Sequence, residues 1–271
     1  MSSPYWSGPV IEPRDWRNLP VEELTRAERN MAFCERYLRV PEGNKVGSPL
    51  RFEEFQERFF YAIYDNTVPT RRAYLSMARK NGKTATIACI VLIHTVGPEA
   101  VRNSRIQSGA LSREQASEVF NYASKMVMLS DSISPLIRII PSSRSLVGLP
   151  MNVTYRAIAA EAKTTMGGSP ILAILDETGQ VKGPQDDFID AIETSQGAYD
   201  NPLLISISTQ AAEDSDLFSI WLDDAKSSKD PTIVAHVYTA PAGCDLLDEK
   251  AWKAANPALD LFRSRSDLES I

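Results

Sequence analysis

The stretch LSMARKNGKTATIACIVLIH, residues 75–94, contains the tripeptide Gly82-Lys83-Thr84. A short apolar run precedes the tripeptide and a longer one follows it, which predicts a buried strand, a loop and a helix in that order. The complete phosphate-binding loop has the pattern G-x-x-x-x-G-K-[ST], and here Met77 occupies the position of the first glycine. The motif is incomplete, so the rest of the chain must decide whether this loop binds phosphate.

The predicted start of the helix is a favourable place for a phosphate. Free backbone N–H groups and the helix dipole both attract an anion there. In such a loop Gly82 lets the backbone approach the phosphates, Lys83 reaches the β- and γ-phosphate oxygens, and the Thr84 hydroxyl ligates magnesium. The alternative is that Lys83 is a solvated lysine at the start of a helix.

A phosphate loop that works in catalysis needs a second site, because phosphoryl transfer requires an acid to hold the metal and a base to position water. The segment ILAILDE, residues 171–177, provides candidates for both. Its apolar residues run directly into Asp176 and Glu177, at the expected carboxyl end of a buried strand, where parallel sheets bind ligands. We expect Asp176 to hold magnesium and Glu177 to orient the attacking water. Alternatively, the two carboxylates only end a strand or cap the next helix.

A third apolar segment, LLISISTQ at residues 203–210, ends in Ser208, Thr209 and Gln210. Hydroxyl and amide groups at the end of another central strand would lie between the two nucleotide motifs and sense the γ-phosphate. Ordinary turn residues are an equally good explanation from the sequence alone.

Outside these motifs, the apolar residues repeat in two ways. Spacings of three and four residues between Leu24 and Leu38, after Pro20, and again within residues 52–66, predict two N-terminal helices. Further strands are expected at 73–77, 105–110, 137–140, 150–155, 170–177, 202–209 and 232–238, with helices at 84–96, 112–129, 185–197 and 215–228. Strands that alternate with helices imply a mainly parallel sheet with helices on both faces.

Composition limits the possible classes of protein. The chain has 271 residues, of which 43% are hydrophobic, so it can bury a substantial core. Three separated cysteines and two histidines form neither a disulfide framework nor a zinc set, which favours a reducing compartment. No signal peptide or membrane span is indicated. The net charge of -6 argues against coating of nucleic acid by the whole surface but allows a local basic face.

Together these motifs resemble the ATPase half of the large terminase subunit of tailed double-stranded DNA bacteriophages, of the lambdoid or HK97-like type. The resemblance covers nearly the whole chain and is based on LRFEEFQERFF (50–60), ARKNGKT (78–84), GGSPILAILDETGQ (167–180), NPLLISISTQ (201–210) and LDEKAWKAANPAL (247–259). Phosphate loops of this family often lack the first glycine and carry a basic residue in the middle, so Met77 is compatible with them. The resemblance implies an α/β P-loop NTPase of the ASCE, RecA-like class, with a mainly parallel sheet, helices on both faces and a helical N-terminal extension.

The resemblance also implies roles for individual residues. Gln56 matches the glutamine that reads adenine, and Arg79 matches the arginine of the loop, with a catalytic role beside Lys83 and Glu177. The expected nucleotide-binding residues are Gln56, Ala78, Arg79, Lys80, Asn81, Gly82, Lys83 and Thr84, and the expected metal ligands are Thr84 and Asp176. Ser208, Thr209 and Gln210 match the motif that couples hydrolysis to movement.

An arginine from a neighbouring subunit is also expected at the γ-phosphate in this family. Arg144 and Arg156 lie between the two nucleotide motifs and are candidates for it. Neither matches a motif tightly, and a structural or surface role is the alternative for each.

The implied activity is magnesium-dependent ATP hydrolysis that drives double-stranded DNA into a procapsid. The implied partners are the DNA, the portal protein, the small terminase subunit and further copies of the chain in a ring, although the isolated chain can be a monomer. The implied location is the host cytoplasm, with transient binding at the procapsid portal and no membrane contact.

Three segments are expected: an N-terminal helical extension (1–50), the P-loop ATPase core (51–240) and the start of a linker toward an absent nuclease domain (241–271). Nuclease activity is not expected in this chain, since Asp176-Glu177 is its one compelling acidic pair. Two rival functions remain from the sequence. One is a helicase-type P-loop motor, which needs a second RecA-like domain or a hexameric ring. The other is a nonenzymatic binding module, which would show no magnesium-dependent nucleotide affinity.

Overall fold

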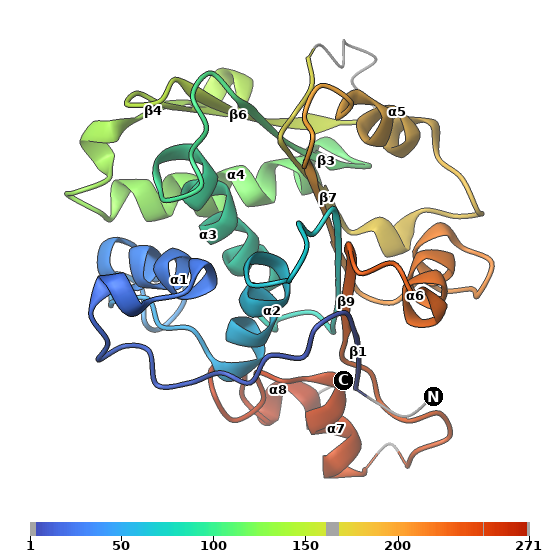
Figure 1. Cartoon of the computed structure of the whole chain (residues 1–271). Helices are drawn as coiled ribbons and strands as arrows, with labels where there is room; N and C mark the ends of the chain where they lie inside the picture. Colours follow the sequence, from blue (N-terminus) through green and yellow to red (C-terminus); the bar gives the residue numbers. More distant parts are fainter. Residues whose placement is uncertain (1–3, 161–167, 246, 270–271) are drawn as a thin grey trace.

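A central sheet organises the computed structural model, which describes residues 4–160, 168–245 and 247–269 (Figure 1). The sheet has nine strands in the order β1-β9-β2-β8-β7-β3-β6-β5-β4 within the described residues. Their bounds are β1 Tyr5–Ser7, β2 Arg72–Ser76, β3 Arg105–Ala110, β4 Ile137–Ile140, β5 Ser145–Gly148, β6 Val153–Ala159, β7 Leu172–Asp176, β8 Leu203–Ser208 and β9 Ile233–Val237. The strands from β9 to β6 in this order are parallel, whereas β1, β5 and β4 pair antiparallel with their neighbours. The predicted, mainly parallel sheet is confirmed.

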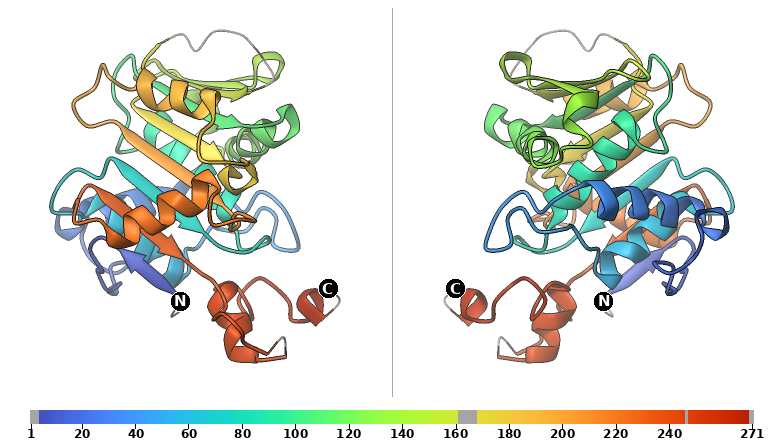
Figure 2. Two further views of the ribbon diagram at one scale, coloured as in Figure 1. Left: turned by 90° about the vertical axis from the view of Figure 1, so that its right-hand side faces the viewer. Right: turned by 90° about the vertical axis from the view of Figure 1, so that its left-hand side faces the viewer.

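Helices cover both faces of this sheet (Figures 1 and 2). They are α1 Arg26–Tyr37, α2 Glu54–Tyr64, α3 Lys83–Val96, α4 Arg113–Met128, α5 Asp187–Ser195, α6 Leu217–Ser227, α7 Glu249–Ala255 and α8 Ser266–Glu269. Helices α1 to α4 lie on one face, and α5 and α6 lie on the other. The short helices α7 and α8 lie beyond one end of the sheet, near α2.

The larger part of the core lies between the sheet and α1 to α4. Helix α3 is apolar on nearly all sides and is buried along most of its length, because the sheet, α1 and α4 all pack against it. On the other face, Tyr74 of β2 stacks on Trp221 of α6 with ring centroids 5.5 Å apart. The sheet is therefore packed between two layers of helices.

Most predicted elements are confirmed, with local differences. Helix α1 begins at Arg26 behind a capping box made by Thr25 and Glu28, and Pro20 instead precedes the short 3-10 turn Val21–Glu23. Strand β6 begins at Val153, later than predicted, because Asn152 adopts a left-handed turn conformation with φ of 52°. The short elements β1, β5, α7 and α8 were not predicted.

Within the described part of the chain, no helix is long and apolar enough to cross a membrane. No group of three or more His, Cys, Asp or Glu side chains that could hold a metal is found among those same residues.

Candidate functional site

The loop between β2 and α3, residues 77–82, is the one that the sequence predicts to bind phosphate, and it is called the phosphate loop below. Gly82 is the N-cap of α3 and has a φ of 78°, a left-handed conformation that glycine adopts without strain. Lys80 also has a positive φ, of 64°. The first N–H groups of a helix have no partner inside the helix, so the start of α3 presents donors to the space above the loop. Thr84 lies half-buried in this first turn.

Lys83 is buried under the loop, with 7% of its surface exposed. Its Nζ donates to the carbonyl oxygens of Met77 at 2.9 Å and Ala78 at 3.2 Å. Burial lowers the pKa of Lys83, and the carboxylates of Glu177 and Asp176 oppose this effect. The alternative of a solvated lysine at a helix start is therefore wrong.

Asp176 and Glu177 stand at the carboxyl end of β7, which is separated from β2 by β8 alone. Asp176 is 8% exposed, and burial followed by the charge of Glu177 raises its pKa to about 7, with Lys83 acting in the opposite direction. Glu177 has a φ of 54° and donates its N–H to the Ile207 carbonyl at 2.8 Å, so the chain turns sharply at this residue. Lys83 and both carboxylates thus occupy the same edge of the sheet.

Ser208 connects the two motifs at the end of β8. Its Oγ donates to Glu177 Oε2 at 3.3 Å and accepts from the Gly179 N–H at 2.8 Å. Its carbonyl oxygen accepts from the Met77 N–H at 3.1 Å. Ser208 is the last residue of β8, and it bonds to both the Asp176-Glu177 motif and the phosphate loop. It is therefore part of a strand and not an ordinary turn residue. Thr209, half-buried, and Gln210, exposed, follow directly after it.

Gln56 lies on α2 beside the phosphate loop. Its Oε1 accepts from the Glu53 N–H at 3.0 Å, and its Nε2 donates to Thr86 Oγ1 on α3 at 2.8 Å. A Cβ built on Gly82 would be 3.6 Å from Gln56 Nε2. The structure therefore places Gln56 next to the loop, with its amide held between α2 and α3.

The C-terminal segment 256–263 also contacts the loop, which sequence reasoning missed. Asn81 Nδ2 donates to Asn256 Oδ1 at 3.0 Å, and Asn81 Oδ1 accepts from the Ala258 N–H at 3.0 Å. Arg263 Nη1 donates to the Arg79 carbonyl at 2.9 Å and also to Asn256 Oδ1. The Asn81 side chain thus attaches the C-terminal segment to the phosphate loop. The side chain of Arg79, in the same loop, is exposed. The sequence signal in this segment is the Asn256-Pro257 pair, which marks a turn but does not say where the chain returns.

Arg144 and Arg156 lie far along the sheet from the phosphate loop. Arg144 is in a left-handed turn with φ of 47° before β5, and Arg156 is exposed in the middle of β6. In the strand order, β6 is four positions and β5 five positions from β2. Neighbouring strands are about 4.8 Å apart, so these arginines stand roughly 20 Å or more from the loop of their own chain.

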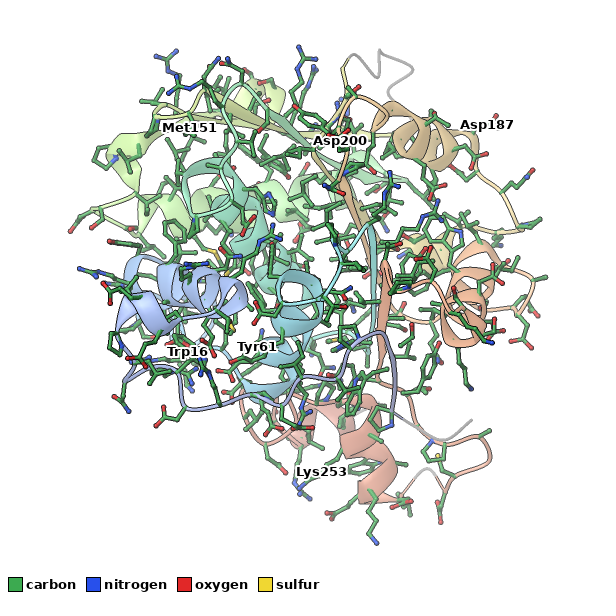
Figure 3. The ribbon with its side chains drawn as sticks, viewed as in Figure 1. Trp16, Tyr61, Met151, Asp187, Asp200 and Lys253 are labelled. Atoms are coloured by element: carbon green, nitrogen blue, oxygen red, sulfur yellow. The ribbon has the colours of Figure 1, made fainter. Side chains whose placement is uncertain are left out.

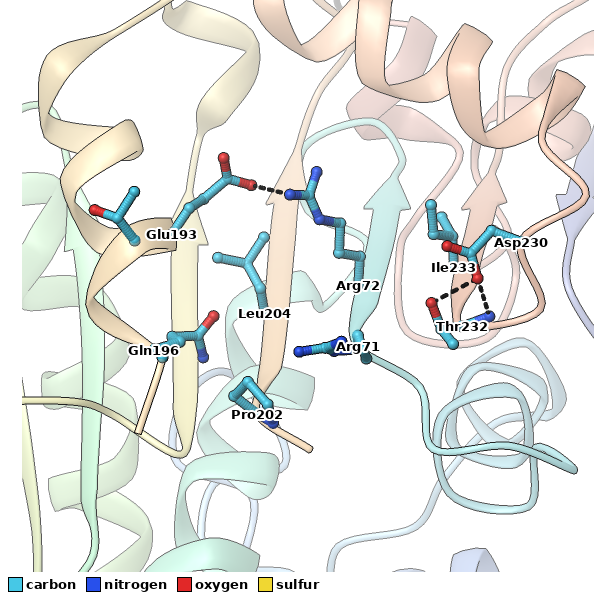
Figure 4. A pocket seen from close by; sticks show the side chains of 11 residues that line it. Arg71, Arg72, Glu193, Gln196, Pro202, Leu204, Asp230, Thr232 and Ile233 are labelled. Carbon is cyan, nitrogen blue, oxygen red and sulfur yellow. Dashed lines mark hydrogen bonds and ion pairs between the residues drawn. The ribbon is translucent and has the colours of Figure 1, made fainter. Parts of the chain in front are cut away.

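A separate cavity of about 430 Å³ opens at the opposite edge of the sheet (Figure 4). Arg71, which precedes β2, and Thr232, which precedes β9, both line it, so the cavity is at the amino ends of these strands. Arg72 pairs there with Glu193 at 3.1 Å. This cavity is therefore separate from the candidate site around Lys83, which lies at the carboxyl ends of the parallel strands.

Comparison with known proteins agrees with this geometry. The family described as "Terminase large subunit, ATPase domain" matches residues 55–229. The chain belongs to this family of terminase ATPase domains. The match includes the phosphate loop, Asp176-Glu177 and Ser208, and the resemblance inferred from the sequence is confirmed.

The HK97 relative that matches this terminase domain is longer than the chain itself. The large terminase subunit of Enterobacteria phage HK97 is 61% identical over 245 residues, which are 90% of this chain and 49% of that protein. The crystal structure of the HK97 bacteriophage large terminase has a TM-score of 0.87 at 60% identity and covers 91% of this chain and 51% of its own. The chain thus spans about half the length of the HK97 protein. The large terminase of a thermophilic bacteriophage in complex with ADP shares the fold, with a TM-score of 0.51 at 11% identity over 69% of this chain and 46% of its own.

Proposed function

We propose that this chain is the motor domain of a DNA-packaging terminase, which binds ATP with Mg²⁺ at the loop before α3 and hydrolyses it to move double-stranded DNA into a procapsid. The observation that carries the proposal is the convergence of Lys83, Asp176, Glu177 and Ser208 at one edge of the sheet. Family membership and the close HK97 relative support it over the helicase-type motor and the nonenzymatic module.

The residues at this edge fit a bound magnesium nucleotide. Asp176 is a buried carboxylate without a hydrogen-bonded cation among the described residues, and the raised pKa reflects this desolvation. A magnesium ion held by Asp176 and the Thr84 hydroxyl would neutralise this charge and the charge on the phosphates. The fit therefore comes from a buried anion that lacks a full counter-charge.

The remaining residues act on the substrate directly. Lys83 exchanges the carbonyls of Met77 and Ala78 for phosphate oxygens, a favourable change for an ammonium group already removed from water. Glu177 orients the attacking water and accepts its proton, while the bond from Ser208 restricts the orientation of the carboxylate. The exposed side chain of Arg79 can reach the phosphates from the loop.

An exposed sheet face supports DNA as the partner. The pairing of Arg138 with Val147 and of Val147 with Thr154 places these residues on one face of β4, β5 and β6, and Arg156, two residues after Thr154, lies on the same face. Helices α3 and α4 cover the other face of β6. Arg138 and Arg156 are exposed and form no ion pair within the described residues, so they are available to phosphates.

The exposed face that carries Arg138 and Arg156 lies away from the C-terminal segment. Met151, just before β6, and Lys253, on α7, are at opposite ends of the molecule (Figure 3). The proposal also includes contacts with the portal protein, the small terminase subunit and neighbouring copies in a ring. It divides the chain into an N-terminal helical extension (1–50), the ATPase core (51–240) and the start of a linker (241–271). These parts are supported by the similarity to the HK97 large terminase.

Thermal unfolding with a nonhydrolysable ATP analogue and Mg²⁺ tests the proposal. A ligand at 100 times its Kd stabilises the folded state by about 2.7 kcal/mol, which raises the Tm by several degrees in a chain of this size. Lys83→Ala should fold but lose this shift, while Lys229→Ala, at an exposed loop lysine, should keep it. An equal shift in the Lys83 variant, or none in the unmodified chain, would contradict the assignment. Binding is the first readout because the isolated domain lacks an arginine from a neighbour and can turn over slowly.

A further inference from the structure

Phe262 is an exposed aromatic side chain beside the phosphate loop. A Cβ built on Gly82 would lie 3.1 Å from Phe262 Cζ and 3.6 Å from Gln56 Nε2. The ring therefore packs edge-on against the glycine that begins α3, on the side where Gln56 also lies. Nevertheless 46% of Phe262 remains exposed to solvent.

The position of this ring is fixed relative to the loop. The Phe262 N–H donates to the Ala258 carbonyl at 3.2 Å, and the Ala258 N–H donates to Asn81 Oδ1 in the loop at 3.0 Å. The next residue, Arg263, donates to the Arg79 carbonyl at 2.9 Å. On the inner side, Phe55 of α2 packs against Phe262 with centroids 6.3 Å apart. Hydrogen bonds on both sides of Phe262 thus place its exposed surface beside the phosphate site.

We infer that Phe262 is the stacking platform for the base of the nucleotide, an inference that rests on the proposed ATP-binding function. When the phosphates bind the N–H groups at the start of α3, the ribose and base must lie within one nucleotide length of Gly82. The exposed surface of Phe262 lies in this region, and an aromatic ring stacks favourably on a purine. The base would cover the apolar surface that Phe262 now presents to water.

This arrangement has a consequence for selectivity. Every base has a π-face, so stacking on Phe262 strengthens the binding of adenine and guanine nucleotides alike. Choice between them must come from groups that contact the edge of the base. The Gln56 amide is a candidate, because its Nε2 would lie 3.6 Å from a Cβ built on Gly82. Phe262 therefore contributes affinity, and its loss should not change the preference for one purine over the other.

Binding measurements on Phe262→Ala test the inference, with ATP, GTP and inorganic tripolyphosphate as probes in the presence of Mg²⁺. The Kd for each nucleotide should rise about 5- to 100-fold, in line with the loss of one base-aromatic stack. Tripolyphosphate has no base, so its Kd should stay the same. Phe262→Trp should keep nucleotide affinity and show fluorescence quenching on ATP addition beyond that of the unmodified chain. The matched control is Leu261→Ala, because Leu261 is 47% exposed in the same segment.

The outcomes separate the two claims. If the unmodified chain binds neither ATP nor tripolyphosphate, the proposed function fails and the inference fails with it. If the unmodified chain binds ATP and Phe262→Ala binds it equally well, the inference alone is overturned. Equal weakening of ATP and tripolyphosphate would also overturn it, because the ring would then support the loop and not the base.

Discussion

The hydroxyl of Ser208 lies 3.3 Å from Glu177 Oε2 and accepts the Gly179 N–H at 2.8 Å. A hydroxyl has one proton to donate, and the bond from Gly179 directs this proton toward the carboxylate. The Ser208 carbonyl also accepts the Met77 N–H at the start of the phosphate loop. The end of β8 is thus bonded to the proposed base and to the loop, so a shift of either one is transmitted to the other.

Ser208→Ala should lower kcat for ATP hydrolysis about 10-fold with little change in ATP Kd, because it frees the orientation of Glu177 but removes no phosphate contact. Steady-state hydrolysis and equilibrium binding measure the two quantities. Ser206→Ala is the control, since Ser206 Oγ donates to Thr178 Oγ1 at 2.8 Å and does not touch Glu177. A rise in KM at constant kcat in the Ser208 variant would argue against this positioning role.

The two neighbouring carboxylates should have separable roles. Glu177→Gln should bind ATP normally but hydrolyse it at least 100-fold more slowly, because an amide does not accept the proton of water. Asp176→Ala should instead weaken ATP binding in the presence of Mg²⁺ and have a smaller effect without it. Titrations of both variants with and without Mg²⁺ measure these effects. If the two variants behave alike, the division of roles is wrong.

Much of the sheet, and the position of the candidate site on it, could be predicted because both follow from local patterns. The apolar runs that end in Ser76, Asp176 and Ser208 mark the central strands, and parallel strands bring these ends to one edge. The attachment of Asn81 to Asn256 could not be predicted, since a bond across 175 residues leaves no periodic signal. The proximity of Phe262 to Gly82 depends on the same return of the chain. Short strands such as β1 carry too few residues to show alternation.

Acid should destabilise the protein partly through His236. This histidine lies buried on β9 between Trp6 and Phe59, and burial lowers its pKa to about 3, with a smaller contribution from Arg58. Below pH 6.5 the unfolded chain takes up a proton that the folded chain does not, so this contribution to the free energy of unfolding falls as the pH falls toward 3. The slope is about 1.4 kcal/mol per pH unit.

Urea unfolding between pH 7.5 and 4.5 measures this effect in His236→Leu. The difference in free energy of unfolding between this variant and the unmodified chain should shift by about 1.4 kcal/mol per unit below pH 6.5, in favour of the variant. The two proteins are compared by the slope of the free energy of unfolding against pH, because Asp176 contributes a pH dependence of the opposite sign. Its pKa is raised to about 7, so its contribution to the free energy of unfolding rises as the pH falls. Parallel curves for the two proteins would show that His236 does not carry the effect.

The two candidate arginines should separate by function, because they occupy different parts of the same end of the sheet. Arg156 projects from the exposed face of β6 together with Arg138, which suits contact with DNA phosphates. Arg144 precedes β5 in a turn, and its carbonyl accepts from the N–H of Ala157, in the carboxyl half of β6, at 3.0 Å. Arg144 therefore lies toward the edge of the sheet that carries the proposed nucleotide site. That position suits insertion into the site of a neighbouring copy.

Arg156→Ala should therefore weaken DNA binding and reduce the slope of log K against log salt by about 1, the value for one lost phosphate contact. Arg144→Ala should leave DNA binding unchanged and slow ATP hydrolysis of the assembled ring by a large factor, on the order of 1,000-fold, with no effect on nucleotide binding by the isolated chain. Each variant is the control for the other, and Arg71→Ala, at the opposite edge of the sheet, should change neither property. If Arg156→Ala abolishes hydrolysis in the ring while Arg144→Ala does not, the trans-acting residue is Arg156 and the exposed face is a contact between subunits.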